Sequence, residues 1–457
     1  MQKNKNQTLL EKLKYMHQEH LLQYLEDLDA SYQKQLTEEI LSLPEEKVLE
    51  MQKCLKHPLH ERCLSFEPFL DYVIAGNDQY ILKGEKILKE GKAGCLIVAG
   101  GQGTRLGMPK NASKGTFPIT IVKKKSLFQL FAEKTKAASL FAGKQLPIAI
   151  MTSLLNHDSV VAHFRENDYF GLDEEQVSFF SQETYPFLDD HGKLFLESPN
   201  HLAKGPCGNG YALSCFYKSA IWQKWKEKNI SYISFVQIDN ALADPFSAEL
   251  LGFHVDQNNE VSIKCAKRQE ESVGVLVKQN GHCRVIEYFE FPKKEWQAKK
   301  SDGSFLHECA NLSLFCFDRD FIEKVTLYYC IQMPYHPVKK SSNSFVKRDG
   351  QIYPIKKESW KFEKFIFDCL PFASRIGAIL FPREHCFAPL KNSEGCDSID
   401  TVHALLQQTD VNVYKKVTGT TPPQRTFELA QEFYYPTSEL LQKWKNKPLP
   451  DAAYIEP

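Results

Sequence analysis

The stretch GCLIVAGGQGTRLGMPKNASKGTFP, residues 94–118, joins an apolar run to a glycine-rich loop. The run from Cys95 to Ala99 predicts a buried strand, because a continuous apolar stretch stopped by glycines suits a parallel sheet covered on both faces. Gly100, Gly101 and Gly103 carry no Cβ and tolerate positive φ, so several backbone N–H groups can converge on an anion there. The stretch therefore predicts a strand that ends in a loop of phosphate-binding size.

Two cations, Arg105 and Lys114, accompany this loop and favour a nucleotide triphosphate over an ordinary turn. The Rossmann dinucleotide fingerprint does not fit, because Gly101, Gly103 and Gly107 are spaced G-x-G-x-x-x-G rather than G-x-G-x-x-G. A P-loop does not fit either, since no Gly-Lys-Ser/Thr sequence follows the glycines. The loop thus predicts phosphate binding by a different motif.

Length and composition narrow the class of protein. The chain has 457 residues, of which 42% are hydrophobic, so it can bury a large core. Lys plus Arg and Asp plus Glu number 57 each, which predicts no general attraction to nucleic acid or to an anionic membrane. Thirteen cysteines without a C-x-x-C pair argue against a disulfide framework and a zinc ribbon. With no apolar run long enough to span a membrane, we expect a cytoplasmic protein.

Hydrophobic periodicity predicts three regions. Leucines at helical spacing indicate an N-terminal helical domain over residues 1–92. Strand-like and helix-like runs alternate over residues 93–400, which predicts an α/β fold with a doubly wound parallel sheet. Residues 401–457 predict a short C-terminal segment with a helix that ends near Gln408 and a second amphipathic stretch.

Polar residues follow two of the predicted strands. The run from Ser231 to Ile238 is rich in β-forming residues and is closed by Asp239, at the position where ligands bind in open α/β folds. An Asx turn is the alternative explanation for that aspartate. An Asn-Gly pair at Asn280 predicts a β-hairpin and places Glu287 and Tyr288 on its second strand.

Several motifs in the same order resemble the UDP-N-acetylhexosamine pyrophosphorylases of the UDP-sugar pyrophosphorylase family. They are QEHLL at 18–22, AGGQGTRLG at 99–107, YFGL at 169–172, GNG at 208–210, DN at 239–240, EY at 287–288, EKFIFD at 363–368 and PLKN at 389–392. The resemblance covers about residues 10 to 400. It implies a Rossmann-like nucleotidyltransferase core with a mixed, mostly parallel sheet, an N-terminal helical domain and a C-terminal domain.

The same resemblance implies the reaction and its residues. A sugar 1-phosphate would attack the α-phosphorus of UTP, releasing pyrophosphate, with Mg²⁺ as cofactor and with positioning and charge stabilisation as the protein's main task. The implied phosphate contacts are Arg105, Lys114 and Lys361. The implied nucleotide contacts are Val98, Ala99, Gly100, Gly101, Gln182, Gly208 and Asp239, and Asp239 is also the implied Mg²⁺ ligand. The implied sugar and sugar-phosphate contacts are Asn209, Glu287, Tyr288, Asn311 and Lys391.

The sequence departs from the family pattern at three points. The usual Pro-Lys-Gly is Ser-Lys-Gly here, and a second Pro-Lys pair makes Lys110 an alternative to Lys114. Cys207 and Tyr211 replace the acidic residue before GNG and the glycine after it, beside the expected sugar and uracil sites. The short C-terminal segment shows little sign of the small β domain of the relatives, so the oligomeric state is open.

The preferred sugar is N-acetylglucosamine 1-phosphate, because the matching motifs belong to the acetylhexosamine branch. Glucose 1-phosphate is the alternative if the Tyr211 ring fills the space for the acetamide. A hydride-transferring enzyme would need an acidic ribose partner about twenty residues beyond the loop, where residues 119–129 supply only lysines. A non-catalytic nucleotide-sugar sensor would lose the metal carboxylate or the phosphate lysines, yet Asp239, Lys361 and Lys391 are all present.

Overall fold

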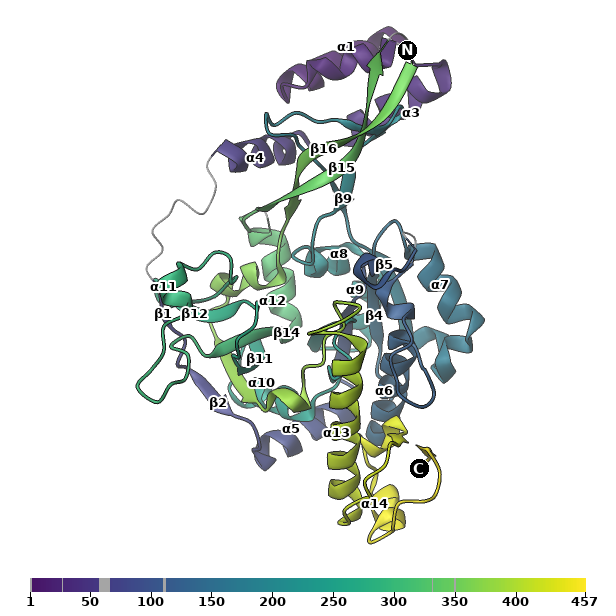
Figure 1. Cartoon of the computed structure of the whole chain (residues 1–457), viewed down its shortest axis with the longest axis vertical. Helices are drawn as coiled ribbons and strands as arrows, with labels where there is room; N and C mark the ends of the chain where they lie inside the picture. The colour runs from purple at the N-terminus through teal and green to yellow at the C-terminus, as the bar shows by residue number, and fades with distance from the viewer. Residues whose placement is uncertain (1, 27, 57–65, 110–111, 331, 349–350) are drawn as a thin grey trace. The chain divides into compact units, whose positions relative to one another are not determined.

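The computed structural model describes residues 2–26, 28–56, 66–109, 112–330, 332–348 and 351–457 (Figure 1). The chain forms two compact units, each made from three separate segments. Unit 1 comprises residues 1–64, 183–211 and 333–365, and unit 2 comprises residues 65–182, 212–332 and 366–457. The division into regions 1–92, 93–400 and 401–457 remains a sequence-based prediction.

Unit 1 combines N-terminal helices with a long β-hairpin. In this hairpin, β15 (His336–Arg348) pairs antiparallel with β16 (Gln351–Glu363). Four short strands, which lie between the helices and the hairpin along the chain, complete the unit. Its helices are α1 (Gln2–Tyr15), α2 (Leu22–Glu26), α3 (Ala30–Ser42) and α4 (Glu45–Lys56), and its short strands are β6 (Thr184–Pro186), β7 (Leu196–Ser198), β8 (His201–Leu202) and β9 (Lys204–Pro206).

Unit 2 is built on a large mixed sheet with the strand order β2-β17-β11-β14-β10-β3-β4-β5. Every neighbouring pair along this path is parallel except those that involve β14, which runs antiparallel to β10 and β11. This confirms the predicted α/β class with a mostly parallel sheet. The strands are β2 (Tyr72–Ile74), β3 (Ala93–Val98), β4 (Ile148–Thr152), β5 (Val177–Ser181), β10 (Tyr232–Gln237), β11 (Val261–Lys267), β14 (Cys309–Asp318) and β17 (Ile376–Phe381).

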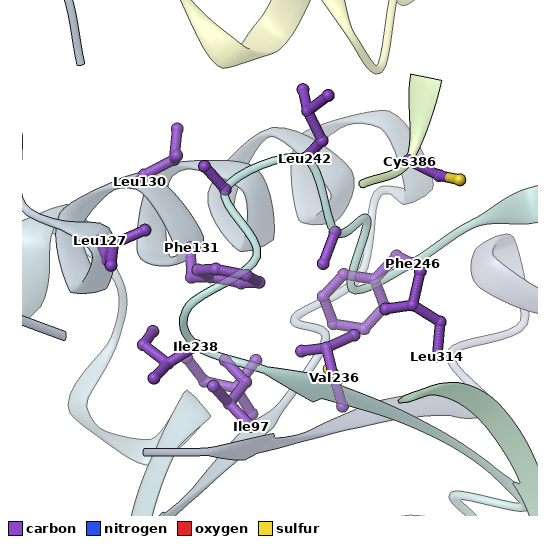
Figure 2. Packing of buried hydrophobic residues seen from close by; sticks show 14 of the residues in the cluster. Ile97, Leu127, Leu130, Phe131, Val236, Ile238, Leu242, Phe246, Leu314 and Cys386 are labelled. Atoms are coloured by element: carbon purple, nitrogen blue, oxygen red, sulfur yellow. The ribbon is translucent and has the colours of Figure 1, made fainter. Parts of the chain in front are cut away.

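Helices alternate with these strands along the chain, as the sequence pattern predicts. The side chain of Ser126 accepts a hydrogen bond from the Gln129 backbone and so caps α6 (Leu127–Ala142), which ends before Gly143 in the left-handed conformation. Figure 2 shows side chains of α6, among them Phe131, packed with Ile97 of β3 and Val236 of β10. The other helices of eight or more residues in unit 2 are α5 (Asp78–Lys89), α7 (His157–Glu166), α9 (Ala220–Glu227), α10 (Ala248–Asp256) and α13 (Ile399–Thr418).

The C-terminal segment differs from the prediction. Helix α13 continues ten residues beyond Gln408, to Thr418, because its apolar stripe extends through Tyr414 and Val417. These side chains pack with α14 (Ser438–Trp444) and with two short parallel strands, β18 (Glu428–Leu429) and β19 (Tyr454–Ile455). Within the described residues, no helix combines the length and the apolar character that a bilayer crossing needs.

Candidate active site

The candidate site of unit 2 lies where the strand order reverses. From β3 the sheet continues through β4 and β5 on one side, and β10 is the neighbour on the other side. In open α/β sheets, ligands bind at such a point outside the carboxyl ends of the strands. The glycine loop leaves β3 at this edge, and Asp239 follows β10 there. Lys114 Nζ donates to Asp239 Oδ2 over 3.1 Å, so residues from both loops meet.

The glycine loop is folded back against its own continuation. The Lys114 backbone N–H donates to the carbonyl of Gly101 over 3.0 Å, and the Ser113 hydroxyl donates to the carbonyl of Ala99 over 3.0 Å. Gly103 and Gly107 adopt left-handed φ values of 67° and 71° on either side of a short 3-10 turn. Arg105 lies in that turn with an exposed side chain, which leaves its guanidinium accessible to a ligand.

Gln182 lies against the glycine loop, although it is far away in the sequence. It follows β5, is 6% exposed, and would place Nε2 only 2.0 Å from a Cβ built on Gly100. A side chain at position 100 would displace the Gln182 amide from this position. Glycine thus allows the close approach of this side chain to the loop backbone.

A second group of predicted residues extends along the same edge of unit 2. Asn311 lies near the start of β14, opposite Cys265 near the end of β11, and its backbone N–H donates to the carbonyl of Gly274 over 2.8 Å. The carboxylate of Glu287 is also beside Gly274, because a Cβ there would lie 2.9 Å from Glu287 Oε1. The predicted sugar contacts Asn311 and Glu287 thus both lie beside Gly274.

The prediction that Glu287 and Tyr288 lie on a strand is wrong. The Asn-Gly hairpin forms, with Asn280 and Gly281 at positive φ, but its second strand β13 (His282–Ile286) ends one residue earlier. Pairing between β12 (Val275–Gln279) and β13 stops at Ile286, and the chain turns there, with the Glu290 carboxylate accepting from the Glu287 N–H. Tyr288 is 42% exposed, so a ligand can reach its ring.

Lys391 is linked to Asp239 through the backbone. The Leu390 N–H donates to the Asp239 carbonyl over 2.8 Å, which fixes the start of the Lys391 loop beside the Asp239 turn. The Lys391 ammonium lies 3.6 Å from the Asp397 carboxylate and is about one-third exposed. A phosphate that took the place of the Asp397 carboxylate could bind the Lys391 ammonium near the carboxyl edge of the sheet.

The remaining predicted residues belong to unit 1. Lys361 lies near the end of β16 and donates to the Glu363 carboxylate. Gly208 packs against the same segment, because a Cβ there would lie 2.5 Å from the carbonyl oxygen of Lys364. Asn209 follows Gly208, and the next residue, Gly210, donates to that carbonyl. Unit 1 therefore groups Gly208, Asn209 and Lys361.

The substituted Tyr211 is buried in unit 1. Its side chain is 5% exposed, and its ring meets Tyr185 edge-on with centroids 5.7 Å apart. The ammonium groups of Lys47 and Lys364 lie 5.2 and 5.0 Å from the ring centroid. The phenol is thus held by aromatic and cation–π contacts inside the unit.

The structure assigns no position to Lys110, which lies outside the described residues, so the choice between Lys110 and Lys114 rests on the Lys114–Asp239 contact. Two buried residues, whose supporting role the sequence analysis did not predict, hold the Asp239 turn. Asn240 accepts from the Ala388 N–H over 2.9 Å, and Lys134 donates to two carbonyls of the turn. For Lys134, the sequence did contain a signal, because a lysine stands within the apolar stripe of α6.

In the part of the chain that the structure describes, no group of three or more His, Cys, Asp or Glu side chains is arranged to hold a metal ion. Asp239 fits the different arrangement in which Mg²⁺ takes one or two protein carboxylates and completes its shell with substrate phosphates and water. Its carboxylate is 17% exposed and already has a cation beside it. The donor set thus fits a metal that arrives with a nucleotide.

The comparisons with known proteins agree with this geometry. The family model described as UTP–glucose-1-phosphate uridylyltransferase matches residues 73–447. A UDP-N-acetylglucosamine diphosphorylase 2 of Arabidopsis thaliana is 29% identical over 85% of this chain and 80% of its own length. A UDP-N-acetylglucosamine pyrophosphorylase of Saccharomyces cerevisiae is 31% identical over 70% of this chain and 68% of its own length.

A solved structure has the same fold. The uridine diphosphate N-acetylglucosamine pyrophosphorylase of Trypanosoma brucei superposes with a TM-score of 0.81, covering 99% of this chain and 98% of that one, at 22% identity. The family match extends over most of the chain, from before the glycine loop to beyond α13. The chain therefore belongs to the UTP–glucose-1-phosphate uridylyltransferase family and is a nucleotidyltransferase of the UDP-sugar pyrophosphorylase kind.

Proposed function

We propose that the protein transfers the uridylyl group of UTP to N-acetylglucosamine 1-phosphate, forming UDP-N-acetylglucosamine and pyrophosphate. The observation that carries the proposal is the contact between Lys114 and Asp239 at the strand-order reversal, where a cation and a carboxylate face the glycine loop. The names of the relatives in Arabidopsis and yeast support the acetylated sugar.

The residues of this chain divide the work between recognition and charge stabilisation. The sugar phosphate is an anionic nucleophile at neutral pH, so no general base is required and repulsion from the triphosphate is the main obstacle. Arg105, Lys114 and Lys361 offset that repulsion at the nucleotide, and Lys391 does so at the sugar phosphate. Val98 to Gly101 present backbone groups to the nucleotide, which orients the α-phosphorus for in-line attack.

We propose Mg²⁺ as the cofactor, with Asp239 as its single protein ligand. The metal would neutralise charge that develops on the phosphate oxygens during transfer. Lys114 holds the Asp239 carboxylate in place before the nucleotide arrives, over the 3.1 Å contact. The protein contributes a positioned carboxylate and cations, and the substrate contributes the other ligands.

The position of Tyr211 supports the acetylated sugar over glucose. A ring that is 5% exposed and fixed by Tyr185, Lys47 and Lys364 within unit 1 is not available to fill space in an open pocket. Asn209, two residues earlier, can then offer its amide to the acetamide, as both donor and acceptor. Discrimination based on hydrophobic room alone is about 10- to 200-fold, so we expect a preference for the acetylated sugar with residual use of glucose 1-phosphate.

The test is a panel of sugar 1-phosphates with UTP and Mg²⁺, in which pyrophosphate release is followed for each sugar. We expect the highest kcat/KM with N-acetylglucosamine 1-phosphate and a lower value with glucose 1-phosphate. A higher value with glucose 1-phosphate would overturn the sugar assignment and leave the reaction class intact. UTP binding without pyrophosphate release from any sugar phosphate would instead support the sensor alternative.

A further inference from the structure

A lysine that the candidate site does not include is buried beside it. Lys134 lies in the buried stripe of α6 and is 7% exposed. Its Nζ donates to the carbonyl of Ala241 over 2.7 Å and to the carbonyl of Ala243 over 2.8 Å. Both carbonyls belong to the turn that follows Asp239. Burial lowers the pKa of Lys134 to about 8, so the fold retains this ammonium despite a desolvation cost.

The turn is held on its other side by the segment that leads to Lys391. Asn240 Nδ2 donates to the carbonyl of Cys386 over 2.9 Å, and Asn240 Oδ1 accepts from the Ala388 N–H over 2.9 Å. The Ala241 N–H donates to the carbonyl of Ala388 over 3.1 Å. Residues 239–243 are therefore fixed between the 386–390 segment and a single side chain of α6.

The chemistry of the turn explains why that side chain is an ammonium. The carbonyls of residues 241 and 243 both accept from one atom, which requires a group with at least two protons to donate. An apolar residue at position 134 would leave the carbonyls of residues 241 and 243 without this donor, and an unsatisfied buried polar group is destabilising. The Asp244 carboxylate, next along the turn, favours the charged form of the lysine, whereas Lys264 opposes it.

We propose that Lys134 is a positioning residue for uridylyl transfer, which fixes the turn after β10 so that the Asp239 carboxylate stays beside Lys114 and faces the nucleotide. This inference rests on the proposed function, because it assigns Lys134 an effect that acts through Asp239. The Lys134 ammonium acts on this turn through the Ala241 and Ala243 carbonyls. Its role differs from a purely packing role because it depends on two directed hydrogen bonds to the Asp239 turn.

A neighbouring cavity allows a direct test of those hydrogen bonds. Lys134 and Asp244 line a partly open cavity of about 390 Å³, with apolar walls that include Leu130, Leu242 and Leu406. Replacing Lys134 by alanine removes the atoms from Cγ to Nζ, which together correspond to n-propylamine. The cavity offers this amine a route to the vacated position.

The experiment compares Lys134→Ala, with and without n-propylamine, with the control Lys136→Ala, which removes an exposed lysine from the same helix. We expect Lys134→Ala to lower kcat/KM about 10- to 100-fold, since a small misplacement of a reacting group costs up to about 100-fold in rate. Saturable recovery with n-propylamine, but not with 1-propanol, is the expected result. Full activity of Lys134→Ala without amine would overturn the proposal.

A double-mutant cycle with Asp239→Asn tests whether Lys134 acts through Asp239. We expect Lys134→Met, which keeps the volume of the side chain and loses its donors, to weaken calorimetric binding of UTP with Mg²⁺ in the wild type and to have little further effect beside Asp239→Asn. Additive effects would overturn the proposal. Because this binding needs no turnover, it reports on Lys134 even if no sugar phosphate yields pyrophosphate, which would refute the proposed function alone.

Discussion

The Asp239 carboxylate, which contacts Lys114, has one role in the free protein and a second proposed role with nucleotide bound. In the free protein the contact holds the carboxylate over the glycine loop, and with nucleotide bound the same oxygens are the proposed Mg²⁺ ligands. These two side chains are only 16% and 17% exposed, so the pair is partly desolvated. The removal of one charge should affect catalysis more than folding.

We therefore predict that Asp239→Asn lowers kcat about 100-fold or more and that the wild type requires Mg²⁺. The amide keeps the shape of the side chain but cannot neutralise a divalent cation, so transition-state charge is less well compensated. Steady-state kinetics across a Mg²⁺ titration, with circular dichroism as a folding control, measures this. Asp256→Asn, at the end of α10, is the matched control and should keep wild-type turnover. Normal turnover of Asp239→Asn would contradict the assignment.

The two phosphate lysines outside the glycine loop should affect different substrates. We predict that Lys391→Ala mainly weakens binding of the sugar phosphate and that Lys361→Ala mainly weakens binding of UTP, because each ammonium acts as a point charge for one phosphate group. Separate calorimetric titrations with each ligand measure the two affinities. Lys357→Ala, four residues before Lys361 on β16 and paired with Asp189, is the control. Loss of UTP affinity alone in both variants would refute this division.

Tyr211 should matter for the stability of unit 1 rather than for the choice of sugar. We predict that Tyr211→Gly lowers the free energy of unfolding by about 3–5 kcal/mol, since a buried aromatic ring is lost, and leaves the kcat/KM ratio of the two sugar phosphates near the wild-type value. Tyr211→Phe keeps the ring and should keep both properties. If the wild type favours glucose 1-phosphate and the glycine variant shifts towards the acetylated sugar, the ring occupies the acetamide space and our assignment is wrong.

At the scale of elements, helix α13 contains a buried carboxyl group that makes the stability of the protein depend on pH. Asp410 lies on the inner side of this helix, 4% exposed, and accepts a hydrogen bond from the Tyr434 hydroxyl over 2.7 Å. Burial raises the pKa of Asp410 to about 8, and the tyrosine hydrogen bond only partly opposes this. The native carboxyl therefore keeps its proton over a range where the unfolded chain has lost it.

The sign of the effect follows from proton binding. Between about pH 4 and pH 8 the native state binds more protons at Asp410 than the unfolded state, so the free energy of unfolding falls as pH rises, by at most about 1.4 kcal/mol per pH unit. We predict that Asp410→Asn, which cannot ionise, gains stability relative to the wild type as pH rises across this range. Denaturant titrations between pH 5 and pH 8 measure the difference. Asp400→Asn, exposed in the first turn of α13, should show no such trend, and an unchanged difference for Asp410→Asn would contradict the prediction.

Elements with a strong local pattern were predictable from sequence. The apolar run at residues 95–99 and the β-rich run at 231–238 each predict a strand, and β3 and β10 form there. The end of β13 was not predictable, because it depends on where pairing with β12 stops. The length of α13 was missed because contacts with the C-terminal segment stabilise its last turns.

The structure brings several of the predicted site residues together, and their functional roles remain predictions, whereas the contacts that support them were not predicted. The motifs identified the glycine loop, Asp239 and Lys391, and the structure places these on one edge of the unit 2 sheet. The contacts that hold them, such as Lys134 with the 241 and 243 carbonyls, join positions about 110 residues apart. Helical periodicity marks position 134 as buried, but only the fold shows what it binds.

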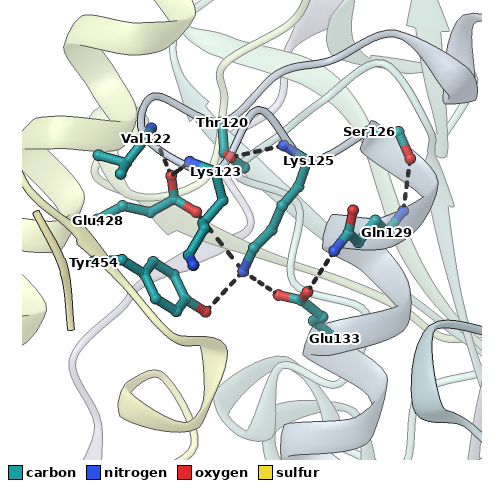
Figure 3. A network of polar contacts seen from close by, with 9 residues as sticks. All are labelled: Thr120, Val122, Lys123, Lys125, Ser126, Gln129, Glu133, Glu428 and Tyr454. Carbon is teal, nitrogen blue, oxygen red and sulfur yellow. Dashed lines mark hydrogen bonds and ion pairs between the residues drawn. The ribbon is translucent and has the colours of Figure 1, made fainter. Parts of the chain in front are cut away.

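At the scale of the whole of unit 2, the end of the chain is part of the core structure. Figure 3 shows Lys125, in the turn before α6, in contact with Glu133 of α6 and with Glu428 and Tyr454 of the C-terminal strands. The Glu428 carboxylate also accepts the backbone N–H groups of Val122 and Lys123 over 2.8 and 3.0 Å. A network with Lys125 and Glu428 each 5% exposed thus joins segments some 300 residues apart.

This network predicts that the C-terminal strands stabilise the turn that follows the glycine loop. Glu428→Ala removes the acceptor of two backbone N–H groups and one counter-charge of Lys125, so we expect the free energy of unfolding to fall by about 2–4 kcal/mol. Glu428→Gln keeps one acceptor oxygen and should lose less than half as much. Denaturant titration at neutral pH measures both variants.

The control for these variants is Glu456→Gln, which changes an exposed glutamate near the end of the same segment and should lie within about 0.5 kcal/mol of the wild type. The order of stabilities is more informative than any single value. A glutamine variant as unstable as the alanine variant would mean that charge dominates and the backbone hydrogen bonds contribute little. Equal stability of Glu428→Ala and the wild type would show that the turn holds its shape without the C-terminal strands, because the pairing of Pro118 with Ser126 and the Phe117–Leu127 hydrogen bond would then suffice.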